Sequence, residues 1–156
     1  VSIGEGSVIK QGTYIKGPAI IGNGCDIGPN CLIRGSTTIG DRCKIGNAVE
    51  LKNSVIMDET NVPHHNYVGD SILGRRCNFG SGTKVANLRL DEDKIIVTHR
   101  GERINAGMRK LGVIMGDDVK TGINSMINVG TIIGEGSFIG PGALADGEIG
   151  AKSRIQ

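Results

Sequence analysis

The sequence predicts an all-β fold, a parallel β-helix of hexapeptide repeats with an inserted loop at about residues 87–112. Large aliphatic side chains recur at a strict spacing of six in the N-terminal part of the chain: Ile3, Ile9, Ile15, Ile21, Ile27, Ile33, Ile39, Ile45, Leu51 and Met57. A period of six fits neither a helix nor an alternating strand, and it is typical of β-helices in which each hexad is a short strand and a turn. Glycine accounts for 26 of 156 residues and aromatic residues for only 3%, so we expect a thin core of small aliphatic side chains.

The order of the repeats predicts where the wall is regular and where it is not. A small or β-branched residue follows nine of these ten aliphatics by four positions and is expected to turn inward as well. Glycine often follows the aliphatic directly, which we attribute to the backbone freedom that turns require. After Pro63 the aliphatic positions shift by one, to Val68, Leu73, Phe79 and Val85, and this shift predicts a bulge. The six-residue spacing returns at Met115 and continues to Ile139.

The segment 87–112 has no six-residue period. Insertions in a solenoid wall project as loops and often serve its binding face. Within this loop the alternating KIIVTH predicts a short strand that is one arm of a hairpin, and GERINAGMRK predicts a turn because it holds Gly101 and Gly107. We expect residues 1–156 to form a single domain. The chain lacks a starting Met and begins inside the repeat, which leads us to expect the C-terminal part of a longer protein.

Composition and charge argue against several classes of function. The formal net charge is +2, from 18 basic and 16 acidic side chains, without the strongly basic stripe of a nucleic-acid binder. There is no apolar run of about eighteen residues and no signal peptide, so we expect neither a membrane span nor secretion but a cytoplasmic protein. The four cysteines lack a CxxC spacing, and we expect them to be small buried residues at inward positions.

Three cations share one position of the repeat. Three hexads make one coil, so residues eighteen apart should stack on one face, and Lys16, Arg34 and Lys52 are eighteen apart. Like charges about 5 Å apart repel by roughly 3 kcal/mol at an effective dielectric of about 20, so the fold alone does not need this cation ladder. A bound phosphate would favour it, because Arg supplies a planar fork of donors and Lys a point charge. The alternative is a solvated face that nearby Asp or Glu side chains neutralise.

The segment VPHHNYVGD, residues 62–70, interrupts the regular wall with two of the three histidines. By the six-residue count, His64 occupies the same position after the aliphatic as Lys52, two hexads later. A histidine exchanges a proton near neutral pH, and bulges often lie beside active sites. The alternative is an ordinary surface histidine on an irregular coil, and the residues alone leave both interpretations open.

Several stretches resemble the acetyltransferase half of bifunctional sugar-1-phosphate nucleotidylyltransferase/acetyltransferases: NAVELKNS, VPHHNYVGD, RCNFGSGT, VAN and VIMGDDVKTGIN. The loop, with NLRLDED and GERINAGMRKLG, resembles the archaeal branch of that family. The resemblance implies a left-handed β-helix that forms a homotrimer. It also implies acetyl-CoA as co-substrate and acetyl transfer to the amine of glucosamine 1-phosphate, in the synthesis of UDP-N-acetylhexosamines. The family's N-terminal nucleotidylyltransferase domain has no counterpart in these 156 residues, which agrees with the expected longer protein.

The resemblance also assigns site residues. It implies that His64 is the catalytic base. It implies sugar-phosphate contacts for Arg34, Lys52, Tyr67 and Asn78, and a place beside the acetyl group for Asn87.

Other assignments stay open. A substrate-contacting lysine near the end of the loop matches Lys110, with Lys94 as a rival because the loop differs in length. Leu88 and Ile123 stand where the bacterial relatives have a Tyr and a Ser, so the resemblance assigns no coenzyme contacts to these two positions. The same changes leave open the choice between glucosamine and galactosamine 1-phosphate.

The implied reaction is direct acyl transfer, in which His64 takes a proton from the amine and no metal is needed. General-base help of this kind contributes about 10²–10⁴-fold. One alternative is a non-catalytic β-helix that oligomerises or regulates a nucleotidylyltransferase. Another is a zinc enzyme, for which His64, His65 and His99 would be the only histidine ligands.

Overall fold

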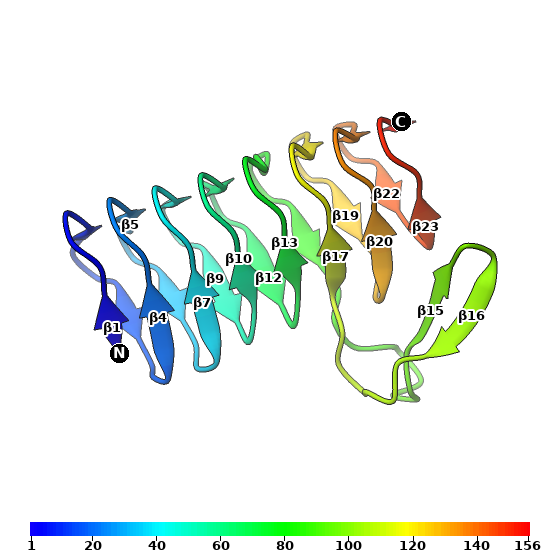
Figure 1. Cartoon of the computed structure of the whole chain (residues 1–156), viewed down its shortest axis with the longest axis horizontal. Coiled ribbons are helices and arrows are strands. Elements are labelled where there is room, and N and C mark those ends of the chain that lie inside the picture. Colours follow the sequence, from blue (N-terminus) through cyan, green and yellow to red (C-terminus); the bar gives the residue numbers. More distant parts are fainter.

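The computed structural model describes residues 1–156 and is built of β-strands without a helix. Short parallel strands stack coil upon coil into a prism, with the first and last coils at its opposite ends (Figure 1). The predicted all-β, β-helical fold is therefore confirmed. The structure holds no helix that could cross a membrane.

Three parallel walls, here called sheets A, B and C, enclose the core. Sheet A comprises β1 (Ser2–Ile3), β4 (Ala19–Ile21), β7 (Thr37–Ile39), β10 (Val55–Ile56), β13 (Ile72–Leu73), β17 (Val113–Met115), β20 (Thr131–Ile133) and β23 (Glu148–Ile149). Sheet B comprises β2 (Val8–Ile9), β5 (Asp26–Ile27), β8 (Lys44–Ile45) and β11 (Asn61–Val62), followed by β18 (Lys120–Thr121), β21 (Phe138–Ile139) and β24 (Arg154–Ile155). Sheet C comprises β3 (Tyr14–Ile15), β6 (Leu32–Ile33), β9 (Glu50–Lys52), β12 (Tyr67–Gly69), β14 (Lys84–Val85), β19 (Met126–Ile127) and β22 (Leu144–Ala145).

All four cysteines are buried, unpaired thiols. The thiols of Cys25 and Cys43 donate to backbone carbonyl groups of the next coil at 3.0 and 3.1 Å. Burial raises the pKa of Cys43 and of Cys77 to about 11. They pack as small apolar residues of the core, as predicted.

Glycine follows many inward aliphatics because the next coil passes too close for a side chain. A Cβ at Gly46 would collide with the carbonyl oxygen of Pro63, and one at Gly80 with the backbone of Gly122. Neither glycine has a positive φ. Close approach between coils, and not the turn flexibility that we expected, accounts for these positions.

Two coils in the middle of the chain have seventeen residues instead of eighteen. Thr38 pairs with Val55, and Val55 pairs with Ile72. The missing residue lies at the corner where the chain passes from sheet C to sheet A, here called the C–A corner. Asn53 and Asp70 turn this corner with positive φ values of 46° and 52°, a conformation that Asn and Asp tolerate better than most residues.

The shorter coil changes which side chains point inward. Ile56 is 1% exposed, whereas Met57, which the spacing placed inside, is 38% exposed. Val62 fills the next inward position with no exposed surface. The predicted bulge at Pro63 is therefore wrong, because the chain loses one residue at each of two C–A corners, at Asn53 before Pro63 and at Asp70 after it.

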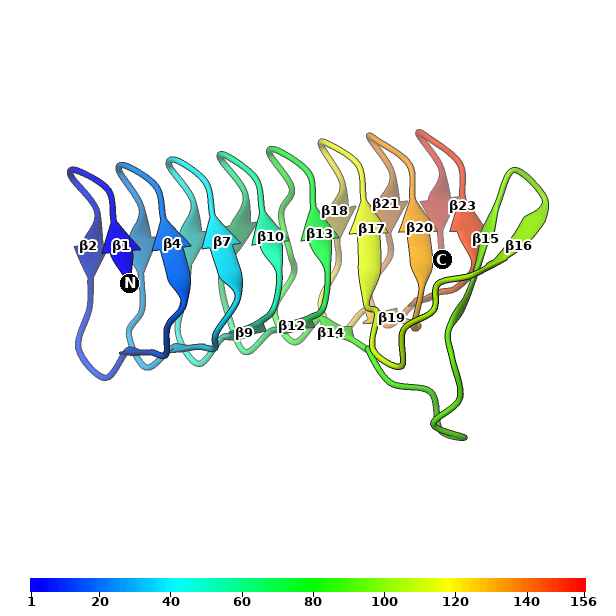
Figure 2. The ribbon, with the colours of Figure 1, turned by 60° about the horizontal axis from the view of Figure 1, so that its bottom comes forward.

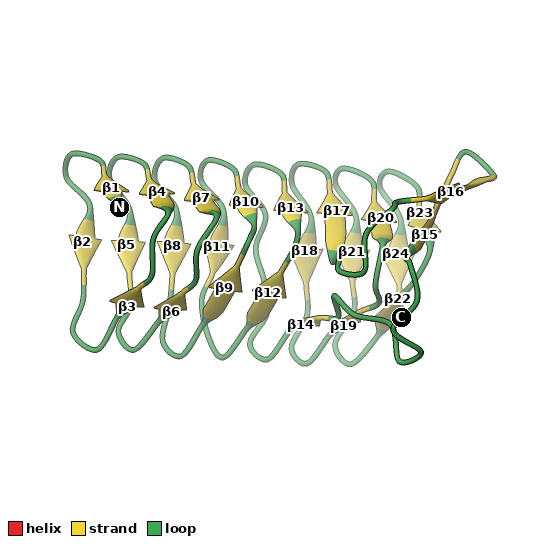
Figure 3. Cartoon of the chain, turned by 90° about the horizontal axis from the view of Figure 1, so that it is seen from below, coloured by secondary structure: helices red, strands yellow, loops and turns green.

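The insertion leaves the prism after β14 and returns before β17, in place of a C–A corner. Its two strands, β15 (Ile96–His99) and β16 (Glu102–Asn105), form an antiparallel hairpin. The hairpin lies beside the C-terminal coils, where β15 contacts β20 and β23 (Figure 2; Figure 3). The strand predicted for KIIVTH is confirmed, whereas the ERIN segment, expected within a turn, is the second strand of the hairpin.

Candidate functional site

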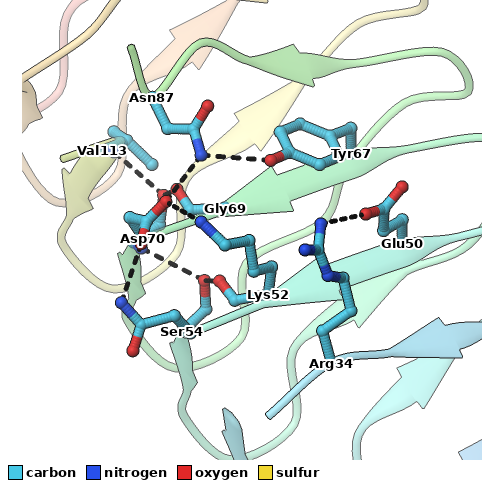
Figure 4. A network of polar contacts seen from close by, with 11 residues as sticks. Arg34, Glu50, Lys52, Ser54, Tyr67, Gly69, Asp70, Asn87 and Val113 are labelled. Carbon is cyan, nitrogen blue, oxygen red and sulfur yellow. Dashed lines mark hydrogen bonds and ion pairs between the residues drawn. The ribbon is translucent and has the colours of Figure 1, made fainter. Parts of the chain in front are cut away.

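The C–A corner brings together four of the predicted site residues (Figure 4). Arg34 follows β6, Lys52 ends β9, Tyr67 opens β12 and Asn87 follows β14. The pairing of β6 with β9 stacks Lys52 on Arg34, as the eighteen-residue spacing predicted. Because all four belong to successive coils of sheet C, their side chains meet along one edge of the prism.

Asp70 lies at the centre of this group and was not predicted. Its Oδ1 accepts a hydrogen bond from Asn53 Nδ2 at 2.7 Å. Its Oδ2 accepts from Asn87 Nδ2 at 2.6 Å and from Lys52 Nζ at 3.1 Å. The residue is only 8% exposed, so these three donors replace water around the carboxylate.

The donors keep Asp70 ionised. Burial by itself would raise the pKa of this carboxyl group, but hydrogen bonds from Asn53, Asn87 and Lys52 lower it below its ordinary value. Asn87 Nδ2 also donates to the Tyr67 hydroxyl at 3.1 Å. Asp70 thereby connects the cation ladder to the two polar side chains beside it.

The charges of the ladder alternate with carboxylates. Arg34 Nη1 lies 3.1 Å from Glu50 Oε1, and these side chains are 45% and 35% exposed. The Lys52–Asp70 pair has the same length, 3.1 Å, but its side chains are only 18% and 6% exposed. Two cations of the ladder therefore have partners within the chain, which agrees with the alternative of local neutralisation and means that the fold does not require a bound anion here.

Lys110 returns from the insertion to the same corner. It lines a cavity of about 220 Å³ together with Asn53, Asp70 and Met108. Neither Lys110 nor Lys16 forms an ion pair, so the corner holds four cations (Lys16, Arg34, Lys52 and Lys110) against two carboxylates (Glu50 and Asp70). Lys94 does not line this cavity, and its carbonyl group accepts a hydrogen bond from Arg89 within the insertion.

His64 does not occupy the position that the six-residue count assigned to it. Lys52 directly follows an inward residue, whereas Pro63 directly follows the inward Val62 and His64 comes one residue later. The prediction that His64 and Lys52 occupy equivalent positions is therefore wrong. It failed because the shortened coil lies between them.

His64 lies at the other end of strand β12, at the corner between sheets B and C. Its side chain is exposed, and its carbonyl group accepts a hydrogen bond from Gly82 N at 3.1 Å. His65 turns the corner with a φ of 52°. The three residues of β12 span about 10 Å, and Tyr67 opens this strand on the His64 side. His64 and the cation ladder therefore border the same outer face of sheet C from its two edges.

Asn78 lies on a different wall. It is exposed on sheet B, where it bridges Asn61 and Lys120. A single chain does not bring it to the C–A corner.

An open groove of about 500 Å³ lies on the outer face of sheet C. Tyr67 and Asn87 line it together with mostly apolar side chains, among them Leu88, Met126 and Leu144. This groove offers space for an extended, partly apolar ligand next to the polar group at Asp70.

The three histidines do not converge within one chain. His64 and His65 are neighbours at the B–C corner, whereas His99 lies on the hairpin with Nδ1 3.1 Å from Glu148 Oε1. No three His, Cys, Asp or Glu side chains of the chain form a group suited to hold a metal ion.

Comparisons with known proteins find relatives that are similar to this chain. A bifunctional sugar-1-phosphate nucleotidylyltransferase/acetyltransferase of Sulfurisphaera tokodaii is 48% identical over 103 residues, which are 66% of this chain and 26% of that protein. A bifunctional protein GlmU of Methanococcus maripaludis (strain C7) is 45% identical over 109 residues, which are 70% of this chain and 26% of that protein. The predicted resemblance to this group, archaeal members included, is confirmed. The chain spans about a quarter of the length of these curated relatives.

A solved structure supports the fold. PerB from Caulobacter crescentus, in complex with CoA and GDP-perosamine, matches with a TM-score of 0.67 and 17% identity, over 85% of this chain and 56% of that one. A family model described as the GMPPB C-terminal domain matches residues 15–135. Because that match covers most of the sequence, the chain belongs to the GMPPB C-terminal domain family.

Proposed function

We propose that this domain transfers the acetyl group of acetyl-CoA to the amine of an amino-sugar 1-phosphate. The observation that carries the proposal is the C–A corner, where Arg34, Lys52, Tyr67 and Asn87 gather around Asp70 in a net positive environment (Figure 4). Relatives named as nucleotidylyltransferase/acetyltransferases support the reaction type. The CoA in the PerB complex supports acetyl-CoA as the co-substrate.

In this proposal the sugar phosphate binds at the cation ladder. Arg34 is the best placed to receive it, because its pair with Glu50 is exposed and such pairs contribute only about 0.2–1 kcal/mol. A phosphate can therefore replace or share the carboxylate at small cost. Lys52 and Lys110 add positive charge from the two sides of the corner, and Arg contributes bidentate geometry.

The sugar ring then extends over sheet C toward His64. Tyr67 and Asn87 contact the ring and the amine, and His64 accepts the proton as the amine attacks the thioester carbonyl. The new C–N bond forms, the C–S bond breaks, and CoA leaves as the thiol after taking up a proton. The chain's own part is to orient the two substrates and to move this one proton. No metal takes part in this scheme.

A homotrimer completes the site in this proposal. Asn78 lies on sheet B, so it reaches the sugar of a neighbouring copy and not that of its own chain. Sheet A also presents an outward stripe of aliphatic side chains that are 37–56% exposed: Ile20, Val55, Ile72 and Ile114. Burial of such a stripe between copies contributes roughly 25 cal/mol per Å². Light scattering is expected to give about three times the chain mass of 16.3 kDa, and a stable monomer at micromolar concentration would contradict the trimer. We place the reaction in the cytoplasm, which the four unpaired cysteines support.

Release of free thiol from acetyl-CoA tests the function. Glucosamine 1-phosphate and galactosamine 1-phosphate are offered in parallel with the two sugars that lack the phosphate. We expect turnover with at least one phosphorylated sugar and a much higher KM without the phosphate. The relative rates of the two epimers identify the substrate. No turnover from a folded, assembled protein would refute the proposal and favour a non-catalytic β-helix that serves a nucleotidylyltransferase.

A further inference from the structure

We propose that Asp70 is a positioning residue that fixes the hydrogen-bond polarity of Asn87 and Tyr67 toward the substrate. The inference rests on the proposed function, and it assigns each of the two side chains one role. The Asn87 carboxamide oxygen accepts an N–H of the acceptor amine, and the Tyr67 hydroxyl donates to a substrate oxygen.

The argument begins with the chemistry of an ionised carboxylate. Such a group only accepts hydrogen bonds, and Asp70 Oδ2 lies 2.6 Å from the Asn87 side chain. The Asn87 amide must therefore turn its Nδ2 toward Asp70, because its oxygen would be repelled there. Asn53 makes the same contact to Oδ1 from the preceding coil at 2.7 Å, so the carboxylate is held from both sides and cannot turn away.

The same bond determines the polarity of Tyr67. Asn87 Nδ2 donates one hydrogen to Asp70 and the other to the Tyr67 hydroxyl at 3.1 Å. Both amide hydrogens are then used, and the only open function of Asn87 is its oxygen, which points away from Asp70 and Tyr67 (Figure 4). Because the Tyr67 oxygen already accepts a hydrogen bond, its own proton is free to be donated outward.

These polarities suit an amine nucleophile. An acceptor that takes one N–H orients the lone pair of the neutral amine. The Tyr67 hydroxyl beside it donates to a ring or phosphate oxygen and therefore does not compete for the lone pair of the amine. Asp70 acts through these neighbours, because both of its carboxylate oxygens already accept hydrogen bonds from Lys52, Asn53 and Asn87.

Asp70→Asn tests the inference with almost no change in shape. Three donors surround Asp70, and an Asn offers one acceptor oxygen, so its NH₂ group would force the Asn87 amide to flip or to lose its bond. We expect kcat for acetyl transfer to fall by about 10²-fold, the effect of misplacing a reacting group by about 1 Å. The KM for the sugar phosphate should not rise, because Lys52 loses its carboxylate partner and is freer to bind phosphate.

The chain offers a matched control variant and a double-mutant cycle. Asp26 accepts a hydrogen bond from Lys10 Nζ at 2.9 Å on sheet B in the N-terminal coils, so Asp26→Asn makes the same chemical change outside the site and should leave kcat within about twofold. In an Asn87→Ala background, Asp70→Asn should lower kcat by less than about threefold, because residues that act through one another are not additive. A native rate for Asp70→Asn, or an equal loss in both backgrounds, would overturn the inference.

A second readout does not depend on activity. The Asn87 side-chain amide, assigned in the NMR spectrum by its absence from Asn87→Ala, should exchange slowly with solvent because both hydrogens are bonded. Asp70→Asn should speed this exchange by about tenfold or more, and Asp26→Asn should not change it. Unchanged exchange in Asp70→Asn overturns the inference even if no substrate turns over, whereas absence of turnover from the native chain overturns only the proposed function.

Discussion

Two ion pairs at the C–A corner have equal length but different burial, and this difference in burial predicts how much each pair contributes to the free energy of unfolding. Arg34–Glu50 and Lys52–Asp70 both measure 3.1 Å, but the first pair is 45% and 35% exposed and the second 18% and 6%. Two unit charges at this distance attract by about 5 kcal/mol at an effective dielectric of about 20. Removing one partner of a buried pair costs about 3–5 kcal/mol, whereas exposed pairs contribute about 0.2–1 kcal/mol.

We therefore expect Lys52→Met to lower the free energy of unfolding by about 3 kcal/mol at neutral pH. The lower end of the range applies because Asp70 keeps its two amide donors, Asn53 and Asn87. Arg34→Met is the matched control and should lower the same quantity by less than about 1 kcal/mol. Methionine retains the unbranched apolar stem in both variants, so the comparison isolates the charge.

Urea denaturation at a fixed chain concentration measures both variants, since the stability of an oligomer depends on concentration. The pKa of Asp70 is depressed in the folded state. Its stabilising contribution is thus present above the unfolded pKa, about 3.9, and is lost as the pH falls through the folded value. The difference between the native chain and Lys52→Met should shrink in that acid range. Equal losses for the two variants, or a difference that persists in acid, would refute the electrostatic reasoning.

Two further predictions concern the wall and the hairpin. Gly80→Ala should lower the free energy of unfolding, measured by urea denaturation, by about 1–3 kcal/mol, because its Cβ would collide with the backbone of Gly122. Gly150→Ala is the control and should be close to neutral, because its Cβ would find its nearest atom at 3.8 Å. Equal losses at both sites would contradict the close-approach explanation. Glu148→Gln should speed backbone amide hydrogen exchange in β15 and β16 without changing exchange in sheets A, B and C. Glu148 accepts a hydrogen bond from the backbone N–H of Arg100 at 2.8 Å, and a neutral acceptor binds this N–H less strongly. Unchanged exchange in the hairpin would show that apolar packing alone holds the hairpin in place.

The N-terminal half of the prism was predictable because its signal is purely periodic. From Ile3 to Leu51 the inward residue recurs every six positions, and the register of sheet C follows directly. The prediction failed at Met57 because Ile56 and Met57 are both aliphatic, and spacing alone does not show that a corner has lost a residue. A residue with positive φ does not mark the loss either, because Ser36 turns the preceding, full-length C–A corner with a φ of 61°.

The candidate site was predictable in part for the same reason. Stacking of Arg34 and Lys52 needs only the eighteen-residue register, whereas the role of Asp70 depends on the shortened corner that aligns it with Asn53 and Asn87. The sequence also left open whether carboxylates neutralise the ladder. That question depends on side-chain directions at a corner, which the repeat does not specify.

The central claim is that His64 is the general base of an acetyl transfer, and one comparison tests it most directly. Thiol release from acetyl-CoA is measured with the preferred amino-sugar 1-phosphate for the native chain, His64→Asn and His65→Asn. The adjacent His65 is the control, since it is also exposed and Asn tolerates its φ of 52°. The account predicts a loss of about 10²-fold or more in kcat for His64→Asn and a nearly native rate for His65→Asn. A native rate for His64→Asn, or equal losses in the two variants, would contradict it.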